Sequence, residues 1–237
     1  MVTYLATTAA ELSGTAPQEG KIAYMACHFS PGDSGLSNIP PALPTGSMLI
    51  LNDQLPICGH DPHRIGEQLA QTLESLGCDS LLLDFERPEN EETARLCRFL
   101  TKELRCPLGI SHHYANHLDC SVFLPPPPLD MPLAEYLKPW QSRKIWLESA
   151  LEAAEFTITA DGCQESPLPY EPVPNETYIE ESLHCRYRCR VDPDKIRFFL
   201  YRTEDQLDVL SKEANALGVE KNIGLFRQLG KRKPLVK

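Results

Sequence analysis

Two acidic side chains, Asp84 and Glu86, follow directly after the apolar run Leu81–Leu83 and are separated by a single residue. If this run is a strand, the alternation of side chains places both carboxyls on one face, together with Leu82. A carboxyl that emerges from an apolar wall has a raised pKa, and two neighbouring carboxyls push their pKa values apart. One of them could then donate a proton while the other stays ionised, which is the pairing that glycoside hydrolysis uses. The structural alternative is that these acids cap the next helix or pair with Arg87.

Polar residues also follow the other predicted strands. In parallel α/β folds the functional side chains gather at the carboxyl ends of the strands, so these residues are candidates for one common cleft. Glu148 could form an acid and nucleophile pair with Glu86, and it could also be a helix cap or a surface acid. We predict Glu86 and Asp84 as catalytic residues. We expect six further residues to bind substrate: His28, Asp53, His112, Tyr114, Glu148 and Arg227.

Two groups of histidine and cysteine residues contain the side-chain types that bind metal ions. They are Cys58, His60 and His63, and His112, His113, His117 and Cys120. Neither group has the spacing of a zinc finger or of a His-Glu-x-x-His helix. We therefore expect no metal and no cofactor, and a metal-dependent hydrolase remains a third alternative.

The chain that must position these residues alternates short apolar runs with longer helical patterns. One helix is expected to begin at the N-cap Asp61, with Pro62 in its first turn, and to end at Gly77. Another is expected to begin at Thr203, with Gln206 completing a capping box. The predicted helices are 61–76, 91–104, 132–138 and 203–217. The predicted strands are 22–29, 47–52, 80–85, 108–112, 120–124, 144–148, 155–160, 184–191, 196–201 and 222–226.

This alternation predicts parallel strands joined by crossover helices. A closed barrel and an open doubly wound sheet both fit the pattern. The open dinucleotide-binding form is disfavoured because no glycine-rich phosphate loop follows the first strand. We therefore predict an α/β fold of the (β/α)8 TIM-barrel type, small or partly reduced. It would form a single domain over residues 1–237, with an irregular insertion around 163–181.

Residues 79–86 resemble the fourth-strand signature of family 18 glycoside hydrolases, the chitinases and related barrels. That signature is Asp-Gly-x-Asp-x-Asp-Trp-Glu, and Asp79, Asp84 and Glu86 coincide with three of its acidic positions. The strand 196–201, the helix after Thr203 and the strand 222–226 resemble the C-terminal part of that family. The resemblance implies that Glu86 is the general acid and that Asp84 orients the acetamido group of the substrate. The acetamido oxygen then attacks the anomeric carbon, so no protein nucleophile is needed.

The chain also differs from this signature. Leu82 replaces the middle aspartate, Phe85 replaces the tryptophan, and Phe226 stands in the last strand where a tryptophan is usual. The strand is third among the predicted strands rather than fourth, so a strand has been missed or the barrel is reduced. These differences support the main alternative to an enzyme, a carbohydrate-binding or scaffold barrel without catalysis.

Composition limits the partners and the location. The formal net charge is −10 and the pI is about 5.2, so the chain repels nucleic acid and anionic membranes, and we expect neither as a partner. The basic run 231–237 is short and we expect a solvated tail. The first residues contain no secretory signal, and the nine cysteines are spread along the chain, which favours reduced thiols and a cytoplasmic protein. The expected ligand is a small molecule or an oligosaccharide.

Overall fold

Eight parallel strands close into a barrel in the computed structural model, which describes residues 1–229 except 13–20, 32–34, 58, 172 and 175. The first strand pairs with the second and with the last, and this double pairing closes the barrel. A short strand, β3 (Leu36–Ser37), adds antiparallel to β2. The prediction of a small TIM-like barrel is therefore confirmed. The barrel strands in order are β1 (Val2–Thr7), β2 (Lys21–Phe29), β4 (Met48–Asn52), β5 (Ser80–Asp84), β6 (Leu108–Ser111), β7 (Ser121–Leu124), β8 (Ile145–Ser149) and β14 (Val219–Leu225).

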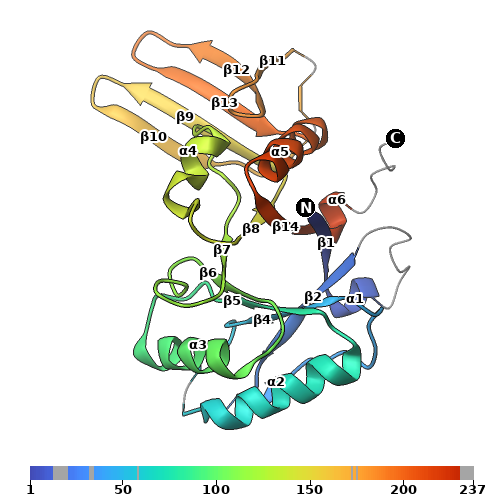
Figure 1. Cartoon of the computed structure of the whole chain (residues 1–237). Coiled ribbons are helices and arrows are strands. Elements are labelled where there is room, and N and C mark those ends of the chain that lie inside the picture. The colour runs from blue at the N-terminus through green and yellow to red at the C-terminus, as the bar shows by residue number, and fades with distance from the viewer. Residues whose placement is uncertain (13–20, 32–34, 58, 172, 175, 230–237) are drawn as a thin grey trace.

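The helical layer outside the barrel is reduced. The helices α2 (Pro62–Leu76) and α3 (Glu91–Glu103) lie side by side below the sheet (Figure 1). The connection 112–120 between β6 and β7 consists of turns instead of a helix. The remaining helical segments are α1 (Ala9–Leu12), α4 (Leu133–Leu137), the 3-10 turn η1 (Lys138–Trp140), α5 (Glu204–Ala216) and α6 (Phe226–Leu229). No helix in the described part of the chain is long and apolar enough to cross a membrane.

The ends of α2 have the capping residues predicted from the sequence, whereas the start of α5 does not have the predicted capping box. The side chain of Asp61 accepts a hydrogen bond from the His63 N–H at 3.1 Å, and Gly77 ends α2 with a left-handed φ of 63°, as predicted. The prediction of a capping box at the start of α5 is wrong. The hydroxyl of Thr203 donates to the carboxylate of Asp205 and makes no bond to the helix backbone.

The interior of the barrel is a small apolar core of inward-facing side chains. Trp146 on β8 fills most of it and is fully buried. Gly109 on β6 makes room for the indole ring, because a Cβ at this position would lie 2.2 Å from Trp146 Cε3. Leu82 projects into the same core, so the face of β5 that carries Leu82 is the inner face. The members of this core are Tyr4, Ala6, Ala23, Met48, Ile50, Leu82, Phe123, Trp146 and Ile223.

A second, antiparallel sheet is inserted between β8 and β14 and lies above the barrel beside α4 and α5 (Figure 1). It contains strands that the sequence patterns assigned to the barrel, at 155–160, 184–191 and 196–201. It also contains two strands within or next to the segment 163–181, which is therefore not simply irregular. The sheet order is β10 (Gly162–Pro167), β9 (Glu152–Thr159), β13 (Ile196–Arg202), β12 (Cys185–Val191) and β11 (Tyr178–Glu180).

Candidate active site

The two predicted catalytic acids lie at the end of β5, which is the fourth strand of the barrel. The strand that the sequence patterns missed is β1, and its inclusion moves β5 from third to fourth. Leu82 is buried in the barrel core and Asp84 follows it on the same face, half-buried at the mouth. Phe85 points the opposite way and is fully buried, with its ring centroid 6.0 Å from those of Phe29 and Tyr114. Packing of Phe85 on the outside therefore keeps Asp84 on the inside.

Asp84 and Glu86 line a common pocket of about 440 Å³ at the mouth of the barrel. The Glu86 side chain is exposed, whereas Asp84 lies deeper. The pocket walls come from the middle of β2 and from the ends of β4 and β5. Its lining residues are Met25, Asn52, Asp53, Gln54, Asp84, Glu86, Arg87 and Pro88.

Two carboxyls at the mouth have strongly raised pKa values. Burial raises the pKa of Asp84 to about 6, with further contributions from the charges of Glu86 and Asp53, and a hydrogen bond from Ser111 opposes this shift. Burial raises the pKa of Glu148 to about 7, and the charges of Asp84, Glu152 and Glu86 add to it. Asp84, Glu86 and Glu148 thus form one electrostatically coupled cluster, which we call the mouth carboxyls.

Asp53 is buried beneath this cluster and holds the chain that follows β5. Its Oδ1 accepts a hydrogen bond from the Glu86 N–H and its Oδ2 accepts one from the Arg87 N–H, both at 3.0 Å. The guanidinium of Arg87 donates to the backbone carbonyls of Asp53 and Gln54, both at 2.7 Å. Arg87 is therefore turned toward the backbone, and the alternative that it pairs with Asp84 or Glu86 is not observed.

Two predicted histidines lie at strand ends with their rings partly buried. The ring nitrogens of His28 lie 2.8 Å from the Phe29 carbonyl oxygen and 3.0 Å from the amide nitrogen of Asn38. Burial lowers the pKa of His112, and so does the charge of the neighbouring His113. Its ring lies 6.2 Å from Trp140, centroid to centroid. The prediction that these histidines contact a substrate stays a prediction.

Two other predicted residues are committed to contacts within the protein. Tyr114 is 5% exposed on the outer side of the barrel, and its hydroxyl accepts from the Asn90 N–H and donates to the Pro88 carbonyl, each at 3.2 Å. Arg227 pairs with Glu11 at 2.6 Å on the surface. Neither lines the pocket, so the structure does not bring them to the mouth carboxyls.

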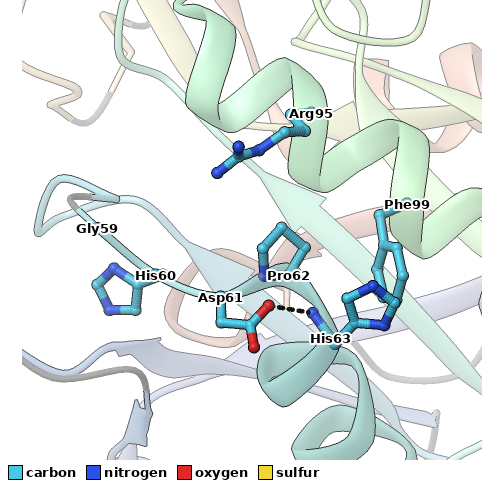
Figure 2. Close-up of a pocket in the computed structure, with 7 residues that line it drawn as sticks. All are labelled: Gly59, His60, Asp61, Pro62, His63, Arg95 and Phe99. Carbon is cyan, nitrogen blue, oxygen red and sulfur yellow. Dashed lines mark hydrogen bonds between the residues drawn. The ribbon is translucent and has the colours of Figure 1, made fainter.

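The histidines considered for metal binding lie in two separate places. Figure 2 shows His60 and His63 on opposite sides of the Asp61–Pro62 segment, in a separate pocket of about 520 Å³ near the start of α2. Cys58 lies outside the described residues. Among the residues that the structure describes, no three His, Cys, Asp or Glu side chains lie together as a metal-ligand set.

Several residues around the mouth were not singled out from the sequence. Asn52 ends the same predicted strand as Asp53 but was not among the predicted site residues, and the strand-end rule could have included Gln54, which follows Asp53. Tyr136 carried no such signal because it reaches the mouth from α4. Burial raises the pKa of its hydroxyl, as do the charges of Glu148 and Glu152, and the hydroxyl donates to the Pro125 carbonyl at 3.0 Å.

Comparison with known proteins finds similarity at the level of structure alone. No protein-family model matches the chain, and no curated protein matches its sequence. The fold is similar to a family 18 chitinase from Cycas revoluta in complex with (GlcNAc)4, with a TM-score of 0.60, 10% identity and coverage of 96% of both chains. It is also similar to the Bacillus cereus spore cortex-lytic enzyme SleL, with a TM-score of 0.59, 11% identity and coverage of 94% of this chain and 70% of that enzyme.

A third similar structure is a family 18 N-acetylglucosaminidase from Paenibacillus barengoltzii, with a TM-score of 0.56, 11% identity and coverage of 94% of each chain. The structural class is therefore a reduced TIM-like barrel of the kind found in family 18 chitinases and spore cortex-lytic enzymes. At such low identity the similarity defines the fold, and the chemistry has to be argued from the site.

Proposed function

We propose that this protein is a glycoside hydrolase whose active site is the pocket lined by Asp84 and Glu86. The observation that carries the proposal is the location of this acid pair, at the carboxyl end of the fourth strand of a closed barrel. The family 18 signature that residues 79–86 resemble belongs to the same strand. The raised pKa of Asp84 supports the proposal further, because perturbed carboxyls gather at catalytic sites.

In the proposed reaction Glu86 donates a proton to the glycosidic oxygen while the bond from that oxygen to the anomeric carbon breaks. The acetamido oxygen of the same sugar attacks the anomeric carbon and forms a cyclic ion. Asp84 orients the acetamido group and stabilises the positive charge on its nitrogen. Water then opens the ring, and Glu86 takes up the water proton and returns to its starting state.

The proposed substrate is a glycan or glycoside with an N-acetylated sugar at the cleaved bond, because this mechanism requires an acetamido group. A cytoplasmic location, which we expect from the sequence, would restrict the substrate to small or imported oligosaccharides. The charges at the mouth agree with a neutral or cationic sugar, since the mouth carboxyls repel anions.

A second candidate function is carbohydrate binding without hydrolysis. The observation that favours it is Leu82, which stands where the family signature has an aspartate and which is completely buried in the barrel core. Such a barrel would keep the pocket and lose turnover.

The deciding experiment is hydrolysis of a panel of chromogenic glycosides, N-acetylglucosaminides included, by the wild type, Glu86→Gln and Asp84→Asn. We expect activity on N-acetylated substrates, with losses of about 10²- to 10⁴-fold in Glu86→Gln, which is the range for removing a general acid. Glu89→Gln is the matched control, because Glu89 is an exposed acid in the same loop that does not line the pocket.

Hydrolysis that persists in Glu86→Gln would contradict the proposed role of Glu86. Binding of N-acetylated oligosaccharides without any turnover by the wild type would favour the second candidate function.

A further inference from the structure

Asp53 is the only acid at the mouth whose carboxylate is engaged on both oxygens by backbone N–H groups, among the residues that the structure describes. It is 5% exposed and lies directly after β4, next to β5 in the barrel. The two amides that it accepts from belong to Glu86 and Arg87. A buried carboxylate with two such bonds is a rigid support, because losing it would leave backbone donors without partners.

The direction in which Glu86 points depends on the backbone at residues 85 to 87. β5 ends at Asp84, so the sheet ladder does not hold Glu86. Phe85 anchors one side of this segment, because its ring is fully buried beside Phe29 and Tyr114 on the outside of the barrel. Asp53 and the Arg87 guanidinium, which bonds back to the carbonyls of Asp53 and Gln54, anchor the other side. Between the two anchors the Glu86 side chain faces the pocket.

We propose that Asp53 is a positioning residue for the acid pair, which fixes the backbone of Glu86 through two hydrogen bonds and acts on Asp84 through its charge. This inference rests on the proposed function, since it assigns a role within the same site. Each carboxylate oxygen of Asp53 already accepts one backbone hydrogen bond, and these contacts support a positioning role. Asp53 also lines the pocket, so the expectation that it binds substrate stays a prediction.

The charge of Asp53 acts on Asp84 together with other groups. Those that raise the pKa of Asp84 are Glu86 on the same segment and Asp53 after β4, and Ser111 on β6 opposes them with a hydrogen bond. Glu148 on β8 is coupled to Asp84 as well. Removing the negative charge of Asp53 makes the ionised form of Asp84 less unfavourable, so the pKa of Asp84 must fall.

The test is Asp53→Asn, which keeps the size of the side chain and one acceptor oxygen but removes the charge. Asp61→Asn is the matched control, because it is the same change in the same connection between β4 and α2, and asparagine is an equally good N-cap there. Two quantities are measured in each folded variant: the pH profile of glycoside hydrolysis, and the ¹³C NMR titration of the Asp84 carboxyl, assigned with Asp84→Asn.

In Asp53→Asn we expect a loss of kcat/KM of about 10- to 100-fold, the size that a small misplacement of a catalytic group produces. We also expect the Asp84 midpoint, and the limb of the pH profile that follows it, to move to lower pH. Asp61→Asn should change neither. Faster hydrogen exchange of the Glu86 and Arg87 amides should accompany the loss.

An unchanged Asp84 midpoint in Asp53→Asn would overturn the proposal, and so would a pH profile and rate equal to those of Asp61→Asn. A merely structural role would lower the melting temperature and leave the midpoint in place. If the wild type hydrolyses no glycoside, that result counts against the proposed function alone, because the carboxyl titration and amide exchange still decide the role of Asp53.

Discussion

Replacing Glu148 with glutamine should stabilise this protein at pH 8 and leave its stability at pH 4 almost unchanged. Glu148 has its pKa raised from 4.5 to about 7, chiefly by burial. A raised carboxyl pKa means that the folded state holds the proton more tightly than the unfolded chain does. The stability contributed by this proton is therefore fully present below about pH 4.5 and is lost as the pH rises through about 7. Glutamine is neutral at every pH and removes this loss.

The size of the effect follows from the shift. A change from 4.5 to about 7 corresponds to about 3 kcal/mol at 1.36 kcal/mol per pKa unit. The side chain is partly exposed, and solvent screening reduces this to about 2 kcal/mol. For a chain of 237 residues each kcal/mol moves the melting temperature by about 2 to 4 °C, so Glu148→Gln should melt about 4 to 8 °C higher at pH 8.

The assay is thermal and urea unfolding of the wild type and Glu148→Gln at pH 4 and pH 8. Glu67→Gln, at an exposed position on α2, controls for the general loss of one negative charge and should change stability by less than about 0.5 kcal/mol. An equal change at both pH values would show that Glu148 acts through packing and would refute the electrostatic reasoning. A lower stability of Glu148→Gln at pH 8 would refute it as well, since it would mean that the charged form is paired.

Two further substitutions test the framework around the site. Gly109→Ala places a methyl group 2.2 Å from Trp146 and should lower the free energy of unfolding by about 1 to 3 kcal/mol in urea titrations. Gly35→Ala, where the nearest atom is 3.5 Å away, is the control, and equal losses in both would contradict the tight packing inside the barrel. Glu152→Ala removes the partner of Arg202, whose side chain is 1% exposed and lies 2.6 Å from the Glu152 carboxylate. The free energy of unfolding of this variant should fall by about 3 kcal/mol, and adding Arg202→Met should recover most of the loss. A loss below about 1 kcal/mol would show that hydrogen bonds to the Pro127 and Pro128 carbonyls are enough to stabilise this arginine.

The barrel could be predicted from the sequence because its central strands are apolar without alternation, as in 80–84, and because clear helix signals separate them. The first strand, Val2–Thr7, was missed although its valine, threonines and tyrosine are strand-forming residues. The strands of the second sheet were recognised as strands but assigned to the wrong sheet. Pairing partners are set by tertiary contacts that a local pattern does not contain. A usable signal existed in 185–191, where charged and apolar residues alternate as in a half-exposed antiparallel strand.

The residues of the candidate site also fall into those that strand position predicts correctly and those that it does not. Residues in or directly after a strand, such as Asp84, Glu148 and Asp53, were placed at the mouth because alternation and strand direction fix where they point. Tyr114 and Arg227 lie beyond the ends of their strands, where the turn rather than the sheet decides the orientation of the side chain. The prediction from strand ends therefore fails for these two residues, although Glu86, two residues past β5, does line the pocket.

Asp84 and Glu148 have raised pKa values although Leu82 stands where the family signature has an aspartate. In the signature, acidic residues of a single strand influence one another. Here burial is the largest cause of the raised pKa of Asp84, and the charges of Glu86 on the same segment and Asp53 after β4 add to it. Asp84 in turn raises the pKa of Glu148 on β8. The raised pKa values of Asp84 and Glu148 mean that ionising these two carboxyls lowers the stability of the fold as the pH rises. Replacing Glu148 with an amide should therefore raise the free energy of unfolding above about pH 7, and the unfolding of Glu148→Gln at pH 8 measures this directly.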